Sequence, residues 1–245
     1  MKTKLFAILL ALLPVAAHAS ETAVHLDKAP VNIYDKLSLQ RGARTFVNYC
    51  LNCHSANYMR YSRLQDLGLT EQQIADNLLF TAEKVGQPMN IAMHPADGKK
   101  WFGATPPDLT VVARSRDADW LYTYLRSFYR DSSRPTGWNN IVFPNVGMPH
   151  VLWELQGEQA AHFKTEKDHD GKEHEVFEKF ETTKPGKMTK PEFDAMVGDL
   201  VNYLVYMGEP AQAQRKQLGI IVIFFLLGLT VLAYYLKKEF WKDVH

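Results

Sequence analysis

The feature that most constrains this chain is the five-residue motif Cys50-Leu51-Asn52-Cys53-His54, which has the pattern C-x-x-C-H. Its two cysteines are the only ones among 245 residues, so no disulfide framework can include them. Two thiols three positions apart can form thioether bonds to the vinyl groups of one haem, and the adjacent imidazole can then bind the iron. The motif therefore predicts one covalent haem c, attached through Cys50 and Cys53, with His54 as the proximal iron ligand.

Two other functions of a C-x-x-C pair, a redox-active thiol pair and a zinc site, explain fewer residues of the motif. A thioredoxin-like redox pair belongs to a strand–helix unit and has no use for the following histidine. A zinc site would need a second ligand pair at metal-binding spacing, and no further cysteine exists to supply it. Haem attachment is the interpretation that uses all three side chains.

The first 19 residues have the three-part pattern of a secretory signal peptide. Lys2 and Lys4 precede an apolar run over 5–17, and residues 17–19 read A-H-A, a cleavage-site pattern. The apolar run is short for a first membrane anchor, so we expect cleavage after Ala19. Export agrees with the haem prediction, because c-type haem is attached outside the bacterial cytoplasm.

A second apolar segment, 218–236, contains no charged residue. As a helix that rises about 1.5 Å per residue it would be roughly 28 Å long, enough to cross the hydrocarbon core of a bilayer. An exported chain that is stopped by one later segment leaves its short tail in the cytoplasm. The chain is thus expected to comprise a signal peptide (1–19), a periplasmic haem domain (20–214) and a membrane anchor with a cytoplasmic tail (215–245, transmembrane helix 218–236).

Helical periodicity dominates the central region. A helix beginning near Ser38 leads into the haem motif, and Gly42 on it leaves room for a second helix to cross closely. The crossing partner is expected after Thr189, which forms a capping box with Glu192. By analogy with class I c-type cytochromes, we expect a mainly α fold in which these two helices cross beside the haem, with long loop insertions.

Shorter elements are expected between these two helices. Thr70 and Gln73 cap one helix, and residues 117–129 form another that has an apolar face. Strand signals are few, and the clearest is the stretch 173–182, which follows an Asp170-Gly171 turn. We therefore expect one small β-hairpin in a mainly helical domain.

The iron has a sixth ligand or an open distal face. Met148 is the best-placed methionine, because Gly147 and Pro149 flank it and can hold its sulfur on a stiff loop. A thioether favours ferrous iron and raises the potential, whereas a second imidazole lowers it. The alternatives that spacing leaves open are Met89, Met93, His94 and no ligand at all.

Four features follow one another along the chain: C-L-N-C-H-S at 50–55, G-A-T-P-P-D-L at 103–109, G-M-P at 147–149, and one apolar helix near the C-terminus. In this order they resemble the cytochrome c1 family, the haem subunit of quinol–cytochrome c oxidoreductase, or cytochrome bc1 complex. The resemblance extends from about Tyr34 to the C-terminus. It departs from the family at Trp101 and Phe102, where asparagines are common.

The resemblance implies roles for particular residues. Met148 would be the distal ligand, Pro106 and Pro107 would line the haem, and Arg116 would pair with a haem propionate, with Arg114 as the alternative. A guanidinium suits this role because its planar fork can hold a carboxylate.

The resemblance also implies a function and partners. The haem would accept single electrons from a Rieske iron–sulfur protein and pass them to a soluble or membrane-bound cytochrome c, within a dimeric complex that contains cytochrome b. The chain would cross the lipid bilayer of a bacterial inner membrane once, with its haem domain in the periplasm. A competing interpretation is a membrane-anchored monohaem cytochrome c that feeds a terminal oxidase or another reductase.

Residues 166–181 contain seven acids and three lysines. Such a segment can be a solvated insertion, or it can attract a basic soluble cytochrome c by electrostatic steering. The formal charge of the whole chain is +1, and loss of Lys2 and Lys4 with the signal peptide changes it to −1. This charge gives no indication of nucleic-acid binding.

Overall fold

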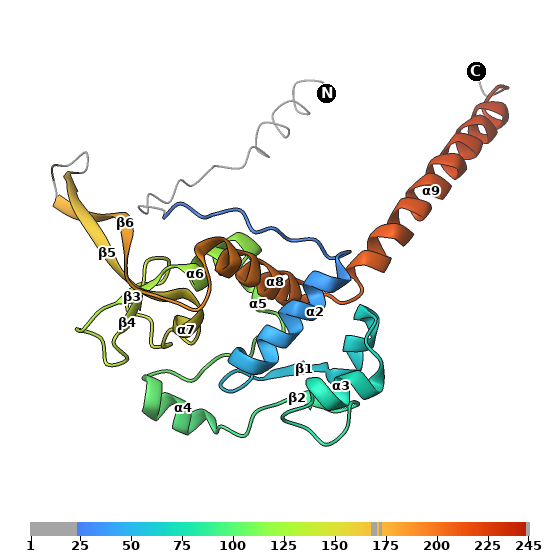
Figure 1. Ribbon diagram of the computed structural model, residues 1–245. Coiled ribbons are helices and arrows are strands. Elements are labelled where there is room, and N and C mark those ends of the chain that lie inside the picture. Colours follow the sequence, from blue (N-terminus) through green and yellow to red (C-terminus); the bar gives the residue numbers. More distant parts are fainter. Residues whose placement is uncertain (1–23, 168–170, 172, 244–245) are drawn as a thin grey trace.

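The structure is a computed structural model that describes residues 24–167, 171 and 173–243. The signal peptide predicted over 1–19 therefore lies outside the described residues. Figure 1 shows a domain built mainly of helices, from which the long C-terminal helix α9 and a two-stranded hairpin project on different sides.

Helices α2 (Lys36–Thr45) and α8 (Lys190–Gly208) lie side by side in the centre of the domain (Figure 1). A Cβ atom at Gly42 of α2 would overlap the backbone carbonyl of Asp199 on α8. The close crossing predicted from Gly42 is therefore present, and it depends on the missing side chain. Arg41 of α2 reinforces the crossing with an ion pair to Asp199 at 2.6 Å.

The ends of these helices follow local sequence signals. Asp35 caps α2 by accepting a hydrogen bond from the Ser38 amide, so the helix begins two residues before the predicted start. The predicted capping box opens α8, since the Thr189 amide donates to the Glu192 carboxylate at 2.8 Å. The buried apolar stripe of α8 includes Phe193, Val197, Leu200, Val201 and Leu204.

The predicted helix over 117–129 is shorter than expected. Helix α6 (Ala118–Arg126) ends at Arg126, because Phe128 already belongs to strand β3 (Phe128–Arg130). Strand β3 pairs antiparallel with β4 (Trp138–Asn140), and no strand signal in the sequence predicts this small sheet. The cap at Thr70 and Gln73 is present at the start of α3 (Glu71–Asn77).

The hairpin consists of β5 (Gly157–Lys167) and β6 (Glu173–Pro185), which pair antiparallel. Asp170 of the predicted turn lies outside the described residues, whereas Gly171 has a φ of 76°, a value that favours glycine. The other described elements are a π-helical turn (Phe46–Cys50), β1 (Ala56–Arg60), a 3₁₀ helix (Tyr61–Leu67), β2 (Pro88–Met89), α4 (Pro95–Phe102), α5 (Val112–Ser115) and α7 (Trp153–Gln156).

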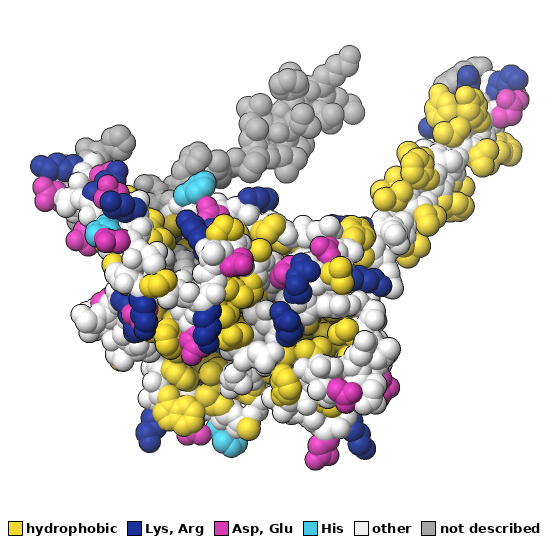
Figure 2. Space-filling view, viewed as in Figure 1, with side chains coloured by type: hydrophobic (Ala, Val, Ile, Leu, Met, Phe, Trp, Pro, Cys, Tyr) yellow, Lys and Arg dark blue, Asp and Glu magenta, His cyan; other side chains and the backbone are white. Residues whose placement is uncertain are grey.

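Helix α9 (Gln212–Phe240) contains the predicted span 218–236 and leaves the domain as an isolated rod. Apolar side chains follow its length in Figure 2, and lysines gather near its C-terminal end. Among the described residues it is the one helix long and apolar enough to cross a membrane, and its apolar window has no buried residue. Its length, about 43 Å at 1.5 Å per residue, exceeds a typical hydrocarbon core.

A candidate haem c site

The haem motif follows α2 through the π-helical turn Phe46–Cys50. The amides of Cys53 and His54 both donate to the carbonyl of Cys50, at 3.1 and 2.9 Å, so the motif forms one compact turn. Both thiols are free, and burial raises the pKa of the Cys50 thiol to about 12. A thiol–disulfide catalyst needs a lowered thiol pKa, so this environment does not suit a redox-active pair.

His54 is held in one orientation by the segment that contains Pro106 and Pro107. Its Nδ1 atom lies 2.7 Å from the carbonyl oxygen of Pro107, to which it donates as Nδ1–H. Burial lowers the pKa of His54, and the carbonyl opposes this shift. A neutral imidazole that carries its proton on Nδ1 presents Nε2 as a metal ligand.

Asp108 anchors this segment beside the haem motif. Its carboxylate accepts hydrogen bonds from the amides of Asn57 and Thr110, at 2.7 and 2.8 Å. The next amide, that of Leu109, donates to the carbonyl of Ser55 at 2.9 Å. The P-P-D-L segment thus has a structural role, because it fixes the Pro107 carbonyl that orients His54.

A cavity of about 320 Å³ opens beside the motif. Its walls carry Cys50, Cys53 and His54 together with Met148, and most of the other lining side chains are apolar or aromatic. Helix α8 contributes Leu200 and Leu204, and the remaining walls include Pro106, Pro107, Phe102, Leu121 and Val146. Two attachment thiols, an oriented imidazole, a thioether and apolar walls on one cavity are a donor set that fits haem c.

Two buried asparagines build the loop that carries Met148. The side-chain oxygen of Asn140 accepts from the amides of Val142 and Phe143, at 2.9 and 3.1 Å. The side-chain oxygen of Asn139 accepts from the amide of Asn145 at 2.8 Å. These bonds fix the loop in place of regular secondary structure, and they hold Met148 at the cavity wall.

The structure distinguishes Met148 from the other candidate distal ligands. The sulfur of Met89 lies 3.7 Å from the Tyr203 hydroxyl, away from the main cavity. Met93 lines a smaller neighbouring pocket with Pro95 and Pro106, and His94 precedes the first residue of α4. Of these four residues, Met148 alone lines the cavity that carries Cys50, Cys53 and His54 together.

The two candidate arginines also differ in position. Arg116 lines the cavity, and its guanidinium lies 4.9 Å from the centre of the Trp120 ring. Arg114 is on α5, and its side-chain carbons lie near Gly208 of α8. Arg116 is therefore the arginine placed to meet a group inside the cavity.

Tyr124, Asn139 and Asn140 were not singled out from the sequence. The Tyr124 hydroxyl donates to the Met148 sulfur at 3.3 Å, and burial raises the pKa of this phenol. In the sequence Tyr124 is simply one aromatic residue in an amphipathic helix. Asn139-Asn140 resembles a turn signal, whereas the structure uses both side chains as buried acceptors.

The oriented histidine, the paired thiols and the long apolar helix α9 together define a membrane-anchored c-type cytochrome with one haem. The family model described as "Cytochrome C1 family" matches residues 26–173 and 181–244. The chain belongs to the cytochrome c1 family.

Full-length relatives agree with this assignment, although their names differ. Cytochrome c1 of Allochromatium vinosum is 48% identical over 246 residues, covering 100% of both chains. The "ammonia monooxygenase gamma subunit" of Nitrosomonas europaea is 51% identical over 245 residues, covering 100% of this chain and 99% of the relative. Cytochrome c1 of Rhodospirillum rubrum is 28% identical over 94% of this chain and 92% of its own length. The bacterial relatives and the isolated helix α9 fit a single-pass inner-membrane protein that carries one haem c.

Proposed function

We propose that this chain carries single electrons within a quinol–cytochrome c reductase, from a Rieske iron–sulfur protein to a cytochrome c. The observation that supports this most strongly is one cavity whose walls include Cys50, Cys53, His54 and Met148, in a chain of the cytochrome c1 family. Cytochrome b and the Rieske protein are the partners that the family implies.

Each site residue has a distinct task in this proposal. Haem c, when bound, supplies an iron that changes between its ferric and ferrous states by one electron. Cys50 and Cys53 would hold the macrocycle, and His54 presents Nε2 because its Nδ1–H donates to the carbonyl oxygen of Pro107. Met148 would supply a soft neutral sulfur, which favours the ferrous state and raises the potential.

The remaining lining residues exclude water and balance charge. Pro106 and Pro107 would cover the haem with side chains that carry no polar group, and Arg116 would pair with a propionate. If His54 and Met148 both bind the iron, no ligand position would be left for a substrate. The chain therefore passes electrons and performs no bond chemistry of its own.

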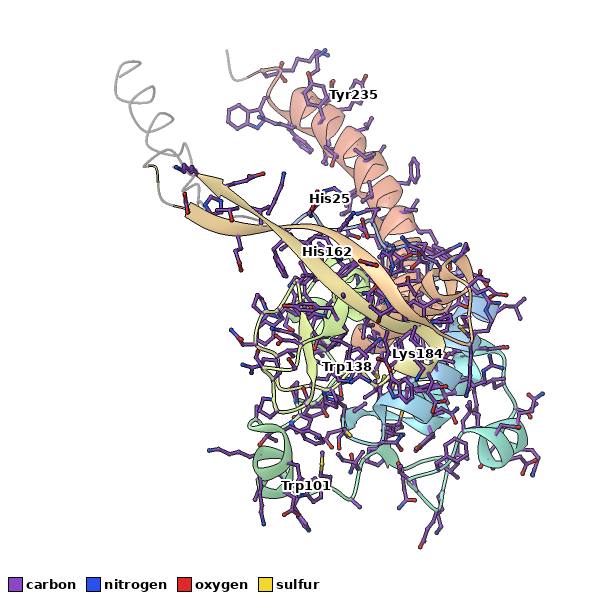
Figure 3. The ribbon with its side chains drawn as sticks, turned by 60° about the vertical axis from the view of Figure 1, so that its left-hand side comes forward. His25, Trp101, Trp138, His162, Lys184 and Tyr235 are labelled. Carbon is purple, nitrogen blue, oxygen red and sulfur yellow. The ribbon has the colours of Figure 1, made fainter. Side chains whose placement is uncertain are left out.

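The electron has a route to partners outside the membrane. Phe102 lines the cavity, and its neighbour Trp101 is 62% exposed on α4. Figure 3 shows Trp101 at the end of the domain opposite Tyr235, which lies on α9. A partner in the aqueous phase can therefore approach this edge of the cavity.

The proposal includes a topology and an assembly. Residues 1–19 would direct export, 20–214 would form a periplasmic haem domain with a fold like that of class I c-type cytochromes, and 215–245 would anchor it. The crossing of α2 and α8 at Gly42, next to the haem motif, supports the fold comparison. The complex would be dimeric and embedded in the lipid bilayer.

A second candidate function uses the same haem in another complex. The name of the relative from Nitrosomonas europaea associates that protein with an ammonia monooxygenase. A membrane-anchored cytochrome of this kind could donate electrons to an oxygenase or a terminal oxidase. The two candidates differ in their partner subunits and in the need for a Rieske protein.

Purification of the tagged full-length chain from its native membrane distinguishes them. We expect cytochrome b and a Rieske protein to copurify, and we expect quinol to reduce the haem c only when the Rieske protein is present. Haem reduction that is unaffected by deletion of the Rieske protein, or copurification with oxygenase subunits alone, would exclude the reductase.

A further inference from the structure

The hydroxyl of Tyr124 lies 3.3 Å from the sulfur of Met148, and its O–H donates to that sulfur. The two residues come from different elements, α6 and the loop before α7, and are 24 positions apart. The contact is therefore a product of the tertiary fold. It lies at the wall of the haem cavity, which both residues line.

The Tyr124 ring is fixed by its neighbours. It stacks on Trp120 with ring centres 4.8 Å apart and an interplanar angle of 12°. It meets Phe128 edge to face at 5.1 Å. Tyr124 as a whole residue is 9% exposed, and Asn140 fixes the backbone by donating to the Tyr124 carbonyl at 2.8 Å. The hydroxyl is thus held at a defined position beside the sulfur.

A thioether sulfur has two lone pairs, and an iron ligand uses one of them. The other can accept a weak hydrogen bond. Donation from a hydroxyl draws electron density from the sulfur, so the sulfur donates less to the iron. Ferric iron depends more on electron donation from its ligands than ferrous iron does. The weaker donation therefore destabilises the ferric state more than the ferrous state. The sulfur also becomes a stereocentre when it binds iron, and a fixed donor on one side selects one configuration.

We propose that Tyr124 is a positioning residue for the distal ligand, which raises the haem potential and selects the configuration of the Met148 sulfur. This inference rests on the proposed function, because it requires Met148 to bind the iron. It assigns Tyr124 a role that a packing residue would not have, since removal of one oxygen atom should change the redox equilibrium.

The test is Tyr124→Phe in the full-length chain within its membrane complex, with Tyr122→Phe as the control. Tyr122 is on the same helix and is also buried, but its ring lies 4.3 Å from the Arg126 guanidinium and does not line the cavity. At a fixed ambient potential we expect Tyr124→Phe to lower the ferrous-to-ferric ratio by roughly three- to tenfold, the range for loss of one hydrogen bond. Tenfold corresponds to about 59 mV for one electron. We expect Tyr122→Phe to leave the ratio within about twofold of its original value.

Two spectroscopic readouts separate this inference from the ligand assignment. The near-infrared sulfur-to-iron charge-transfer band of the ferric protein should be retained in Tyr124→Phe, and the NMR signals of the coordinated methionine should shift. A retained band with an unchanged ratio and unchanged NMR signals would overturn the role of Tyr124 alone. Absence of the band from the unsubstituted protein would overturn Met148 ligation itself and, with it, this inference.

Discussion

The Nδ1 atom of His54 and the carbonyl oxygen of Pro107 are 2.7 Å apart, although 53 positions separate the residues. This contact joins two motifs that are distant in the sequence, C-x-x-C-H and P-P-D-L. Because Nδ1 donates to the carbonyl, the other nitrogen is the one available to iron.

Asp108 should be required for this arrangement. Replacement by alanine removes the acceptor of the Asn57 and Thr110 amides, which should cost about 1–3 kcal/mol of stability. Thermal unfolding of the haem-loaded protein measures the loss. Asp76→Ala is the matched control, because Asp76 is exposed on α3 and should cost less than about 0.5 kcal/mol. Equal effects of the two substitutions would mean that the P-P-D-L segment has no special anchor.

Met148→Leu should remove the sulfur ligand while preserving the volume of the side chain. The midpoint potential should fall on the order of 100 mV, within the ~0.8 V that axial ligands span, and the reduced haem should bind carbon monoxide. Met89→Leu should change neither property, since its sulfur faces Tyr203. If Met89→Leu has these effects and Met148→Leu does not, the distal ligand has been assigned to the wrong sulfur.

Arg116→Gln should lower the haem potential, because a positive charge beside a propionate disfavours the more positive ferric site. The expected size is on the order of 1 kcal/mol for partly exposed charges, or ~40 mV for one electron. Redox titration of the membrane complex checks this value. Arg114→Gln removes the same charge on the side of α8 and should have the smaller effect. The reverse order would transfer the propionate role to Arg114.

Gly42→Ala should destabilise the domain, even though alanine is the better helix former. The new methyl group would overlap the Asp199 carbonyl and force α2 away from α8, at a cost of about 1–3 kcal/mol. Chemical denaturation followed by the haem absorbance measures this. Gly86→Ala provides the comparison, because a Cβ atom there meets nothing within 4 Å. Equal stability of both variants would rule out close packing at the crossing.

The acid-rich segment 166–181 offers a prediction about kinetics. Within the described part of this hairpin, Glu166 already pairs with Lys164 at 2.6 Å, so only some of its acids can act at long range. Glu175→Gln combined with Glu178→Gln should slow reduction of a basic cytochrome c by about two- to threefold at low salt and flatten the salt dependence. A double substitution at Glu71 and Glu83, outside this hairpin, controls for net charge. An unchanged salt dependence would leave the segment as a solvated insertion.

The sequence predicts those parts of the fold that depend on local signals. The capping boxes at Thr70 and Thr189 each follow from a few neighbouring residues. The close crossing at Gly42 is expected from the missing side chain together with the analogy to class I c-type cytochromes. The end of α6 is not predicted from local signals, because the helical pattern continues to residue 129. In the structure, residues 128–130 form β3 instead. The Asn140 side chain stabilises this end of α6 by donating a hydrogen bond to the carbonyl of Tyr124 in the last helical turn.

The predictions about the site show the same difference between local and long-range signals. The proximal residues are contiguous and carry their own signal, whereas the contacts that orient them connect distant segments. Spacing alone could not choose between Met148 and Met89, because the choice depends on which sulfur faces the cavity. The role of Tyr124 as a hydrogen-bond donor could not be predicted for the same reason, because it depends on Met148, which is 24 positions away.

The most direct test of the account is the mass of the mature chain, purified from its native membrane and unfolded before analysis. We expect a chain that begins at Ser20 and carries one haem, with the added mass confined to the peptide that contains Cys50 and Cys53. A chain that has the mass of the polypeptide alone, or that loses its haem on unfolding, would contradict covalent attachment and the electron-carrier function built on it.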